Sequence, residues 1–144
     1  MVIRPELRGR EAYRHFTTIS LRWGDNDAYG HVNNTIYYGW FDSTVNAWLV
    51  GQGLLDIANG DPIGLVVATD CRYFSPLSFP GDVEVGMAVE RIGNASVTYR
   101  LGVFARGADQ PAAEGHFTHV CVARETRRPI ALLPEWRAAI ARLG

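Results

Sequence analysis

Apolar and polar side chains alternate along residues 16–23, which read Phe-Thr-Thr-Ile-Ser-Leu-Arg-Trp. A period of two is typical of a strand with one buried face, and Gly24 ends the pattern. Turn-forming residues separate four further segments of this kind, and the residues 92–96, Ile-Gly-Asn-Ala-Ser, predict a hairpin turn. We predict these additional strands over residues 64–74, 82–92, 96–105 and 112–124.

Between residues 35 and 50 the apolar spacing changes to three and four. The positions concerned are Ile36, Tyr37, Trp40, Phe41, Val45, Trp48 and Leu49. They occupy more than one face at helical spacing, so we predict a largely buried helix that ends near Gly51 and Gly53. A short second helix is predicted over residues 134–143. Pro134 suits its first turn, and one stripe of apolar residues could dock it on the core. That stripe is Trp136, Ile140 and Leu143.

The order of these elements is strand, helix, four strands and short helix, which defines an α+β protein. We expect a five-stranded, mainly antiparallel sheet that packs on the long helix. The length of 144 residues is within the range of one domain, so residues 1–144 are predicted to form a single domain. One sheet on one helix leaves strand edges uncovered, which predicts at least a homodimer.

Composition narrows the classes of partner. The chain is 47% hydrophobic and 20% charged with a net charge of -1, which gives no general electrostatic reason to bind nucleic acid or an anionic membrane. No segment approaches the roughly 20 apolar residues of a membrane span, and the start lacks a secretory pattern, so we expect a cytoplasmic protein. Cys71 and Cys121 lack metal-site spacing and are predicted to be reduced, partly buried thiols.

The segment best suited to form an active site lies just before the long helix. It is residues 22–34, Arg-Trp-Gly-Asp-Asn-Asp-Ala-Tyr-Gly-His-Val-Asn-Asn. A helix start offers unpaired N–H groups and partial positive charge, and an acid beside it supplies a base or nucleophile. Asp27 is therefore a candidate, although an aspartate here also suits a cap or turn. Asp25 is predicted to hold the turn, Gly30 to adopt a positive φ, and Asn33 and Asn34 to cap the helix.

Residues 22–37 resemble the signature of hotdog-fold acyl-CoA thioesterases of the 4-hydroxybenzoyl-CoA thioesterase type. Residues 73–77, Tyr-Phe-Ser-Pro-Leu, and 80–85, Pro-Gly-Asp-Val-Glu-Val, are similar to the second recurring stretch of that family. The order of elements agrees over residues 16–124. The resemblance implies a sheet wrapped around the helix, homodimers that in some cases pair into tetramers, an active site between subunits, and no metal or redox cofactor.

The resemblance also implies residue roles. Asp27 matches the catalytic carboxylate, and the backbone N–H of Asn34 matches the amide that polarises the thioester carbonyl. A preorganised N–H at a helix start stabilises the charge that develops on that oxygen. Asp27 would either attack the carbonyl or take a proton from water, and both routes stay open. His31 is a further candidate, for orienting substrate or transferring a proton.

Several neighbours are candidates for substrate binding: Gly30, Val32, Asn33, Tyr37 and Asp42. Asp42 is also an alternative acid, because other hotdog thioesterases carry a catalytic acid on the helix. The helix aromatics are expected to be mainly core, with one ring lining an acyl pocket. The phosphates of coenzyme A would need charge-assisted hydrogen bonds. The arginines considered for them are Arg72, Arg91, Arg106, Arg124, Arg127 and Arg128.

Other classes fit less well. Asp25-x-Asp27-x-Tyr29-Gly30 resembles a calcium loop, but the twelfth position is Ile36 and not a bidentate glutamate. No Gly-x-Ser-x-Gly nucleophile elbow occurs. Two alternatives to hydrolysis stay open. One is a module that binds acyl-CoA without cleaving it, and the other is a hotdog enoyl-CoA hydratase, which would pair an aspartate with a histidine.

Overall fold

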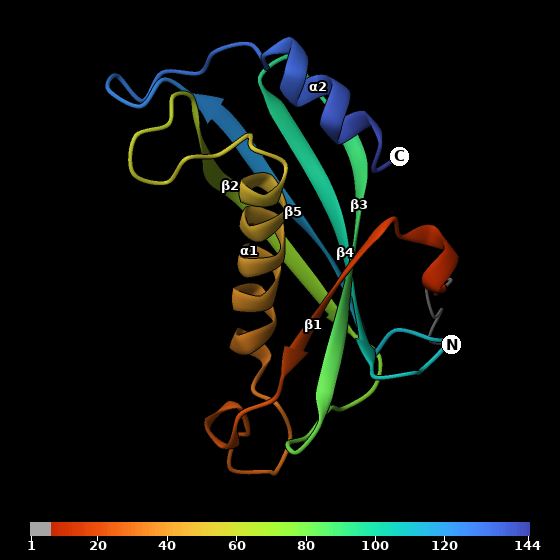
Figure 1. The fold of residues 1–144 in the computed structure, drawn as a ribbon. Helices are drawn as coiled ribbons and strands as arrows, with labels where there is room; N and C mark the ends of the chain where they lie inside the picture. The colour runs from red at the N-terminus through yellow and green to blue at the C-terminus, as the bar shows by residue number, and fades with distance from the viewer. Residues whose placement is uncertain (1–6) are drawn as a thin grey trace, which may run out of the picture.

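The computed structural model describes residues 7–144. Its five strands form one sheet in the order β1-β3-β4-β5-β2, and every pair is antiparallel. The strands are β1 (His15–Ser20), β2 (Ile63–Tyr73), β3 (Asp82–Ile92), β4 (Ser96–Ala105) and β5 (Ala113–Val122). The long helix α1 (Asn34–Gly51) lies against one face of the sheet, and the short helix α2 (Pro134–Ala141) lies at one end of it (Figure 1).

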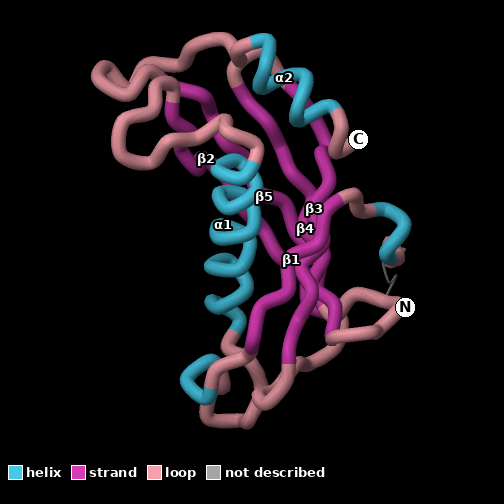
Figure 2. The backbone as a smooth tube through the Cα atoms, viewed as in Figure 1, coloured by secondary structure: helices cyan, strands magenta, loops and turns pink. Residues whose placement is uncertain are grey.

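The sheet curves around α1 (Figure 2). The main core fills the space between them. Alternate residues of β3, Val83, Val85 and Met87, are fully buried in this core, as are Phe41 and Val45 of α1. The period-two pattern of the strands and the helical spacing of α1 therefore bury their apolar sides against each other. This confirms the predicted α+β class and the hotdog arrangement of sheet and helix.

Helix α1 is buried on one side only. Its buried residues are Tyr37, Trp40, Phe41, Thr44, Val45, Trp48 and Leu49. These positions follow a single stripe, while Asp42, Ser43 and Ala47 on the other side are exposed. The prediction of a largely buried helix with more than one buried face was therefore wrong. The helix begins at Asn34, one residue before the predicted start, and Asn33 caps it as expected.

The first strand is shorter than predicted. It ends at Ser20, and Trp23 belongs to a 3₁₀ helix, Trp23–Asp25, where it is 79% exposed. The cause is local, because Arg22 and Asp25 exchange side-chain and backbone hydrogen bonds that turn the chain out of the strand. Alternation in the sequence continued past the point at which this turn begins.

Three smaller predictions, on the hairpin, the α2 stripe and the two cysteines, are confirmed. The N–H of Gly93 donates to the carbonyl of Ser96 at 2.7 Å, which closes the expected hairpin between β3 and β4. The docking stripe of α2 is buried in the core. Cys71 and Cys121 are free thiols, partly and fully buried, and burial raises the pKa of Cys71 to about 11. None of the helices in residues 7–144 has the length and apolar character needed to cross a bilayer.

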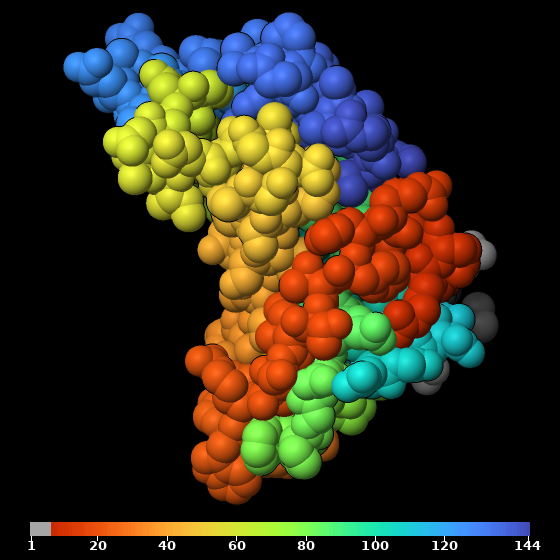
Figure 3. Space-filling model, in the orientation of Figure 1, coloured from red at the N-terminus to blue at the C-terminus, as the bar shows by residue number. Residues whose placement is uncertain are grey.

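The two edges of the sheet differ. Edge strand β1 has 6 residues, whereas edge strand β2 has 11, and no strand among the described residues pairs with its free side. Leu65, Val66 and Val67 of β2 are 36%, 47% and 60% exposed. The molecule is hollowed along the open side of α1, between the segments around residues 22–33 and 54–62 (Figure 3).

Candidate active site

The loop before α1 is built around a buried carboxylate. Asp25 is 1% exposed and accepts the backbone N–H of Arg22 at 2.8 Å and its guanidinium at 2.9 and 3.1 Å. The N–H of Asn33 donates to the main-chain carbonyl of Asp25 at 2.8 Å. Asp25 thus ties the two ends of the loop together, as predicted from its place in the turn.

Asp27 lies in the same loop, and only one of its two carboxylate oxygens accepts hydrogen bonds from the described residues. Its Oδ1 accepts the backbone N–H groups of Tyr29 and His31, at 2.8 and 3.4 Å. Gly30 permits this tight turn with a φ of +79°, which confirms the predicted positive φ. The Oδ2 atom has no partner among residues 7–144. The carboxylate is therefore oriented by the backbone and keeps one oxygen available for a reaction.

The connection between β2 and β3 supports the loop from the other side. The N–H of Val32 donates to the carbonyl of Leu77 at 2.7 Å, and the hydroxyl of Ser78 donates to the carbonyl of Gly30 at 2.5 Å. The N–H of Phe79 donates to Oδ1 of Asn26 at 3.1 Å. Three bonds thus hold the Asp27 loop to the chain that leaves β2.

The start of α1 leaves one backbone donor free. Asn33 Oδ1 accepts the N–H and the hydroxyl of Thr35, at 3.0 and 2.7 Å, and its carbonyl accepts the N–H of Ile36 at 3.0 Å. The N–H of Asn34 has no acceptor within the described part of the chain. Because the helix dipole places partial positive charge at this end, the free N–H is suited to bind an oxygen that carries negative charge.

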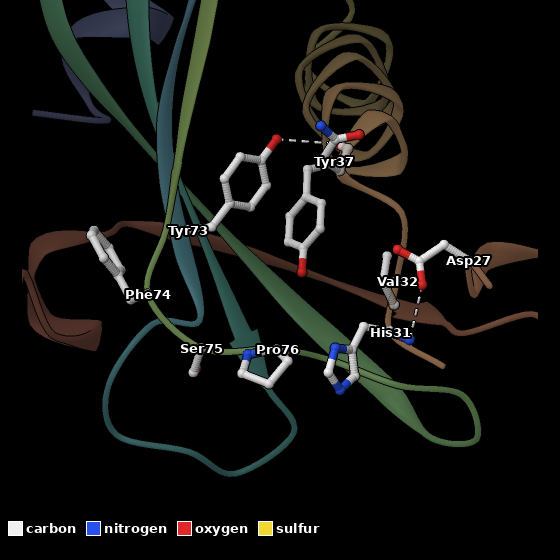
Figure 4. A pocket seen from close by; sticks show the side chains of 9 residues that line it. Asp27, His31, Val32, Tyr37, Tyr73, Phe74, Ser75 and Pro76 are labelled. Carbon is white, nitrogen blue, oxygen red and sulfur yellow. Dashed lines mark hydrogen bonds between the residues drawn. The ribbon is translucent and has the colours of Figure 1, made fainter. Parts of the chain in front are cut away.

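Asp27 and Asn34 line the same cavity, an open cleft of about 530 Å³ (Figure 4). Five of the predicted site residues meet here, and the opposite wall comes from the end of β2 and the residues after it. The lining is Asp27, His31, Val32, Asn34 and Tyr37 on one side and Tyr73, Phe74, Ser75 and Pro76 on the other. His31 is exposed, and its ring has no hydrogen-bond partner among residues 7–144.

Tyr73 joins the two walls, and sequence reasoning gave it no role. Its hydroxyl donates to the carbonyl of Asn34 at 3.0 Å, and its ring lies edge-on to Tyr37 at 5.0 Å between centroids. Burial raises the pKa of both phenols, that of Tyr37 to about 12. The only signal in the sequence was the Tyr-Phe-Ser-Pro stretch at residues 73–76, which carried the resemblance but no assigned chemistry.

Three predicted substrate-binding residues do not line the cleft. Gly30 and Asn33 shape the backbone beside it. Asp42 lies further along α1, on a second cavity of about 580 Å³, and accepts a hydrogen bond from Asn46 Nδ2 at 3.1 Å. The structure therefore does not bring the helix acid together with Asp27.

Three of the arginines considered for phosphate binding already have partners. Arg72 lies 3.6 Å from Glu114, and Arg106 lies 3.0 Å from Asp82. Arg124 donates to the carbonyls of Asp56, Ile57 and Gly60 and thereby holds the loop after α1. Within residues 7–144 no group of three or more His, Cys, Asp or Glu side chains gathers in a way that could hold a metal ion.

Comparison with known proteins identifies the class. Residues 21–140 match the thioesterase-like superfamily, and the chain belongs to this family. The PA5185 protein of Pseudomonas aeruginosa is 49% identical and superposes with a TM-score of 0.92, covering 96% of each chain.

Two other solved structures are more distant. The PA2801 protein of P. aeruginosa, provisionally described as a thioesterase, is 29% identical, with 88% of this chain and 97% of that chain covered and a TM-score of 0.79. Slr0204 of Synechocystis, a 1,4-dihydroxy-2-naphthoyl-CoA thioesterase, is 19% identical over 88% and 94% of the two chains, with a TM-score of 0.78, and shows the shared fold. No curated protein matches the sequence.

Proposed function

We propose that this protein hydrolyses acyl-CoA thioesters, with the division of roles implied by the 4-hydroxybenzoyl-CoA thioesterase type. The observation that carries the proposal is one pair of groups on one cleft. Asp27 has a carboxylate oxygen without a partner, and Asn34 has an N–H without an acceptor, among the described residues. An anionic oxygen and a preorganised donor are the two groups that acyl transfer from a thioester requires.

In the proposed reaction the thioester carbonyl oxygen accepts the N–H of Asn34. Asp27 then acts in one of two ways. As a nucleophile it forms a mixed anhydride that water later hydrolyses, and as a general base it takes a proton from the attacking water. In both routes the C–S bond breaks and coenzyme A leaves as a thiolate that takes up a proton. His31, which lines the cleft, is the proposed source of that proton.

The proposal includes a second copy of the chain. The 11-residue edge of β2 carries exposed Leu65, Val66 and Val67, and such an edge is a template for pairing with another strand. Since Tyr73 of the same strand lines the cleft, a copy paired on β2 would lie next to the site and narrow it. We extend the proposal to dimers that pair further, and to the cytoplasm, where acyl-CoA thioesters are found.

The test measures release of free coenzyme A. The purified protein is mixed with acetyl-, hexanoyl-, palmitoyl- and benzoyl-CoA and a thiol reagent. Wild-type protein is expected to release thiol from at least one substrate, and Asp27→Asn to lower kcat by about 100-fold or more because it removes the ionised oxygen. Asp42→Asn is the matched control and is expected to retain activity.

Other outcomes would point elsewhere. Loss of activity in Asp42→Asn and not in Asp27→Asn would move the catalytic acid to the helix. Tight binding of acyl-CoA without thiol release would favour a binding module. A loss of enoyl absorbance on addition of an enoyl-CoA, without thiol release, would favour the hydratase.

A further inference from the structure

Tyr37 lies three residues after Asn34 on α1, and both residues line the same cleft. Side chains of an α-helix incline toward its N-terminus, and residues three apart share a face, so Tyr37 extends over the turn that contains Asn34. Figure 4 shows the Tyr37 ring beside that of Tyr73, with its hydroxyl directed away from the helix toward the part of the cleft where His31 and Pro76 lie. The cleft thus carries a phenol hydroxyl and the start of the helix on its lining.

The hydroxyl of Tyr37 is free to form a hydrogen bond, although most of the residue is buried. The residue is only 3% exposed, yet it lines the cleft, and its hydroxyl has no hydrogen-bond partner among residues 7–144. A phenol hydroxyl on the wall of a cleft can donate to an acceptor that enters the cleft. A molecule that occupied the cleft would supply the missing acceptor.

Two aromatic neighbours fix the direction of this hydroxyl. Trp40 lies 5.1 Å from the Tyr37 ring at 61°, and Tyr73 lies 5.0 Å away at 86°. These edge-to-face contacts hold the ring in one orientation. Burial raises the pKa of Tyr37 to about 12, so the phenol remains protonated at neutral pH and acts as a donor. A rigid neutral donor beside an accepting oxygen is the arrangement that stabilises developing negative charge.

We infer that the Tyr37 hydroxyl is a catalytic residue, a second hydrogen-bond donor to the thioester carbonyl oxygen as it gains negative charge. It acts beside the N–H of Asn34, forms no covalent bond and keeps its proton. The inference rests on the proposed hydrolase function and adds a side-chain donor to the backbone donor at the helix start.

The first test is Tyr37→Phe, which removes one oxygen and leaves the ring. Loss of one such donor typically costs roughly 100- to 1000-fold in rate, so we expect kcat to fall about 100-fold with little change in KM. The thermal midpoint is expected to stay at the wild-type value, because the hydroxyl has no partner within the described residues. Tyr99→Phe, which removes a hydroxyl elsewhere in the core, is the matched control and is expected to keep wild-type kcat.

The second test replaces Tyr37 by a fluorinated tyrosine whose phenol has a lower pKa. Above that pKa the phenolate no longer donates and repels the developing charge, so kcat should fall as the pH rises. The other titratable groups on the cleft, Asp27, His31 and Tyr73, are present in the wild-type and fluorinated proteins alike. The new basic limb should therefore appear in the fluorinated protein alone, which a purely structural role of the ring would not produce.

The outcomes separate the two proposals. If wild-type protein releases thiol and Tyr37→Phe does so equally fast, the role of Tyr37 is refuted and the hydrolase function stands. The same holds if the fluorinated protein keeps the wild-type pH profile. If wild-type protein releases no thiol from any of the four acyl-CoA substrates, the hydrolase function fails and this inference fails with it.

Discussion

Asp25 and Asp27 are two residues apart and have opposite environments. Asp25 is buried with both oxygens bonded to Arg22, whereas Asp27 lies on the cleft with one oxygen unpartnered in the described chain. Asp25 ends the 3₁₀ helix and is held inward by Arg22, whereas Asp27 begins the turn that follows and lines the cleft. The same residue type therefore serves structure at one position and, by our proposal, chemistry at the other.

This difference predicts different effects of the same substitution. Asp25→Asn weakens hydrogen bonds that involve a charged group, which are worth about 1.5–3 kcal/mol each. We expect it to lower the free energy of unfolding by about that amount in urea titrations, while Asp27→Asn leaves it within about 0.5 kcal/mol of wild type. Equal destabilisation by the two variants would contradict the assignment.

His119 of β5 predicts a pH dependence of stability. It is 6% exposed, its Nδ1 has no partner among residues 7–144, and burial lowers its pKa from 6.5 to about 4, partly offset by Asp42. Below pH 6.5 His119 is protonated in the unfolded chain but stays neutral in the folded chain. The free energy of unfolding therefore falls as the pH drops toward 4.

Urea titrations at pH 7 and pH 5 measure the effect. Between these two pH values the free energy of unfolding of the wild-type protein is expected to fall by about 2 kcal/mol more than that of His119→Gln. The other side chains are the same in both proteins, so their contributions cancel in the comparison. An equal loss in the two proteins would show that His119 is not held neutral by the fold.

The site residues that sequence reasoning reached come from one continuous segment. Turn chemistry and helix periodicity place Asp27, Asn34 and Tyr37 close together, while the roles expected of Asp27 and of the Asn34 N–H came from the family resemblance. Tyr73 meets Asn34 across 39 residues of sequence, and its contact depends on how β2 passes the helix. Turn chemistry and helix periodicity therefore cannot predict the contact between Tyr73 and Asn34.

At the scale of elements, the segment before β1 packs on the outer face of the sheet through Tyr13. Gly86 and Gly102 are paired across β3 and β4, and a Cβ on either would lie within 2.8 Å of the Tyr13 ring. The ring thus fills the space that two missing side chains leave, and its hydroxyl donates to buried Glu114 at 3.2 Å. Only glycine admits so close an approach.

A double-mutant cycle tests this contact. Tyr13→Ala is expected to lower the free energy of unfolding by about 3–5 kcal/mol, as for other buried aromatic residues. Gly102→Ala should also destabilise, because its new Cβ would overlap the ring. The two changes together should cost less than their sum, since the overlap disappears with the ring. Additive losses would contradict direct packing.

Element type was predictable where the period was clear, and element limits were not. Strands β3 to β5 and both helices follow their apolar periods, whereas β2 has no buried residue and was placed by the turn-forming residues on either side of it. The end of β1 was misplaced because the bonds between Arg22 and Asp25 interrupt a pattern that continues in sequence. The open side of α1 was missed because aromatic residues at positions such as 37, 40, 41 and 48 were assigned to more than one face.

At the scale of the molecule, the free edge of β2 predicts an assembly. Val67→Lys places a charge at the most exposed residue of the stretch Leu65, Val66 and Val67, which opposes strand pairing. We expect wild-type protein to sediment as a dimer or larger species and Val67→Lys to sediment as a monomer. Leu7→Lys, a change at a 37% exposed apolar residue in the amino-terminal segment, is the control and should leave assembly unchanged. A wild-type monomer would contradict the proposal.

The order of strands in the sheet could not be predicted from the sequence, because, like the contact of Tyr73, it depends on residues that are far apart in the chain. The patterns gave five strands, but they do not state that β2 crosses to the far side of β5 and becomes an edge. That placement follows from packing all strands on α1 at once. It is also the placement that leaves the longest apolar edge open.

The three hydrogen bonds between the Asp27 loop and the β2–β3 connection couple two properties of the protein. The same short segment leaves the edge strand and supports the backbone beside the carboxylate, through Leu77, Ser78 and Phe79. If a second copy steadies β2, then separating the copies by dilution should loosen that support. Turnover per chain should then decline at low enzyme concentration and recover on concentrating the sample, so initial rates would rise more steeply than linearly with the amount of protein added.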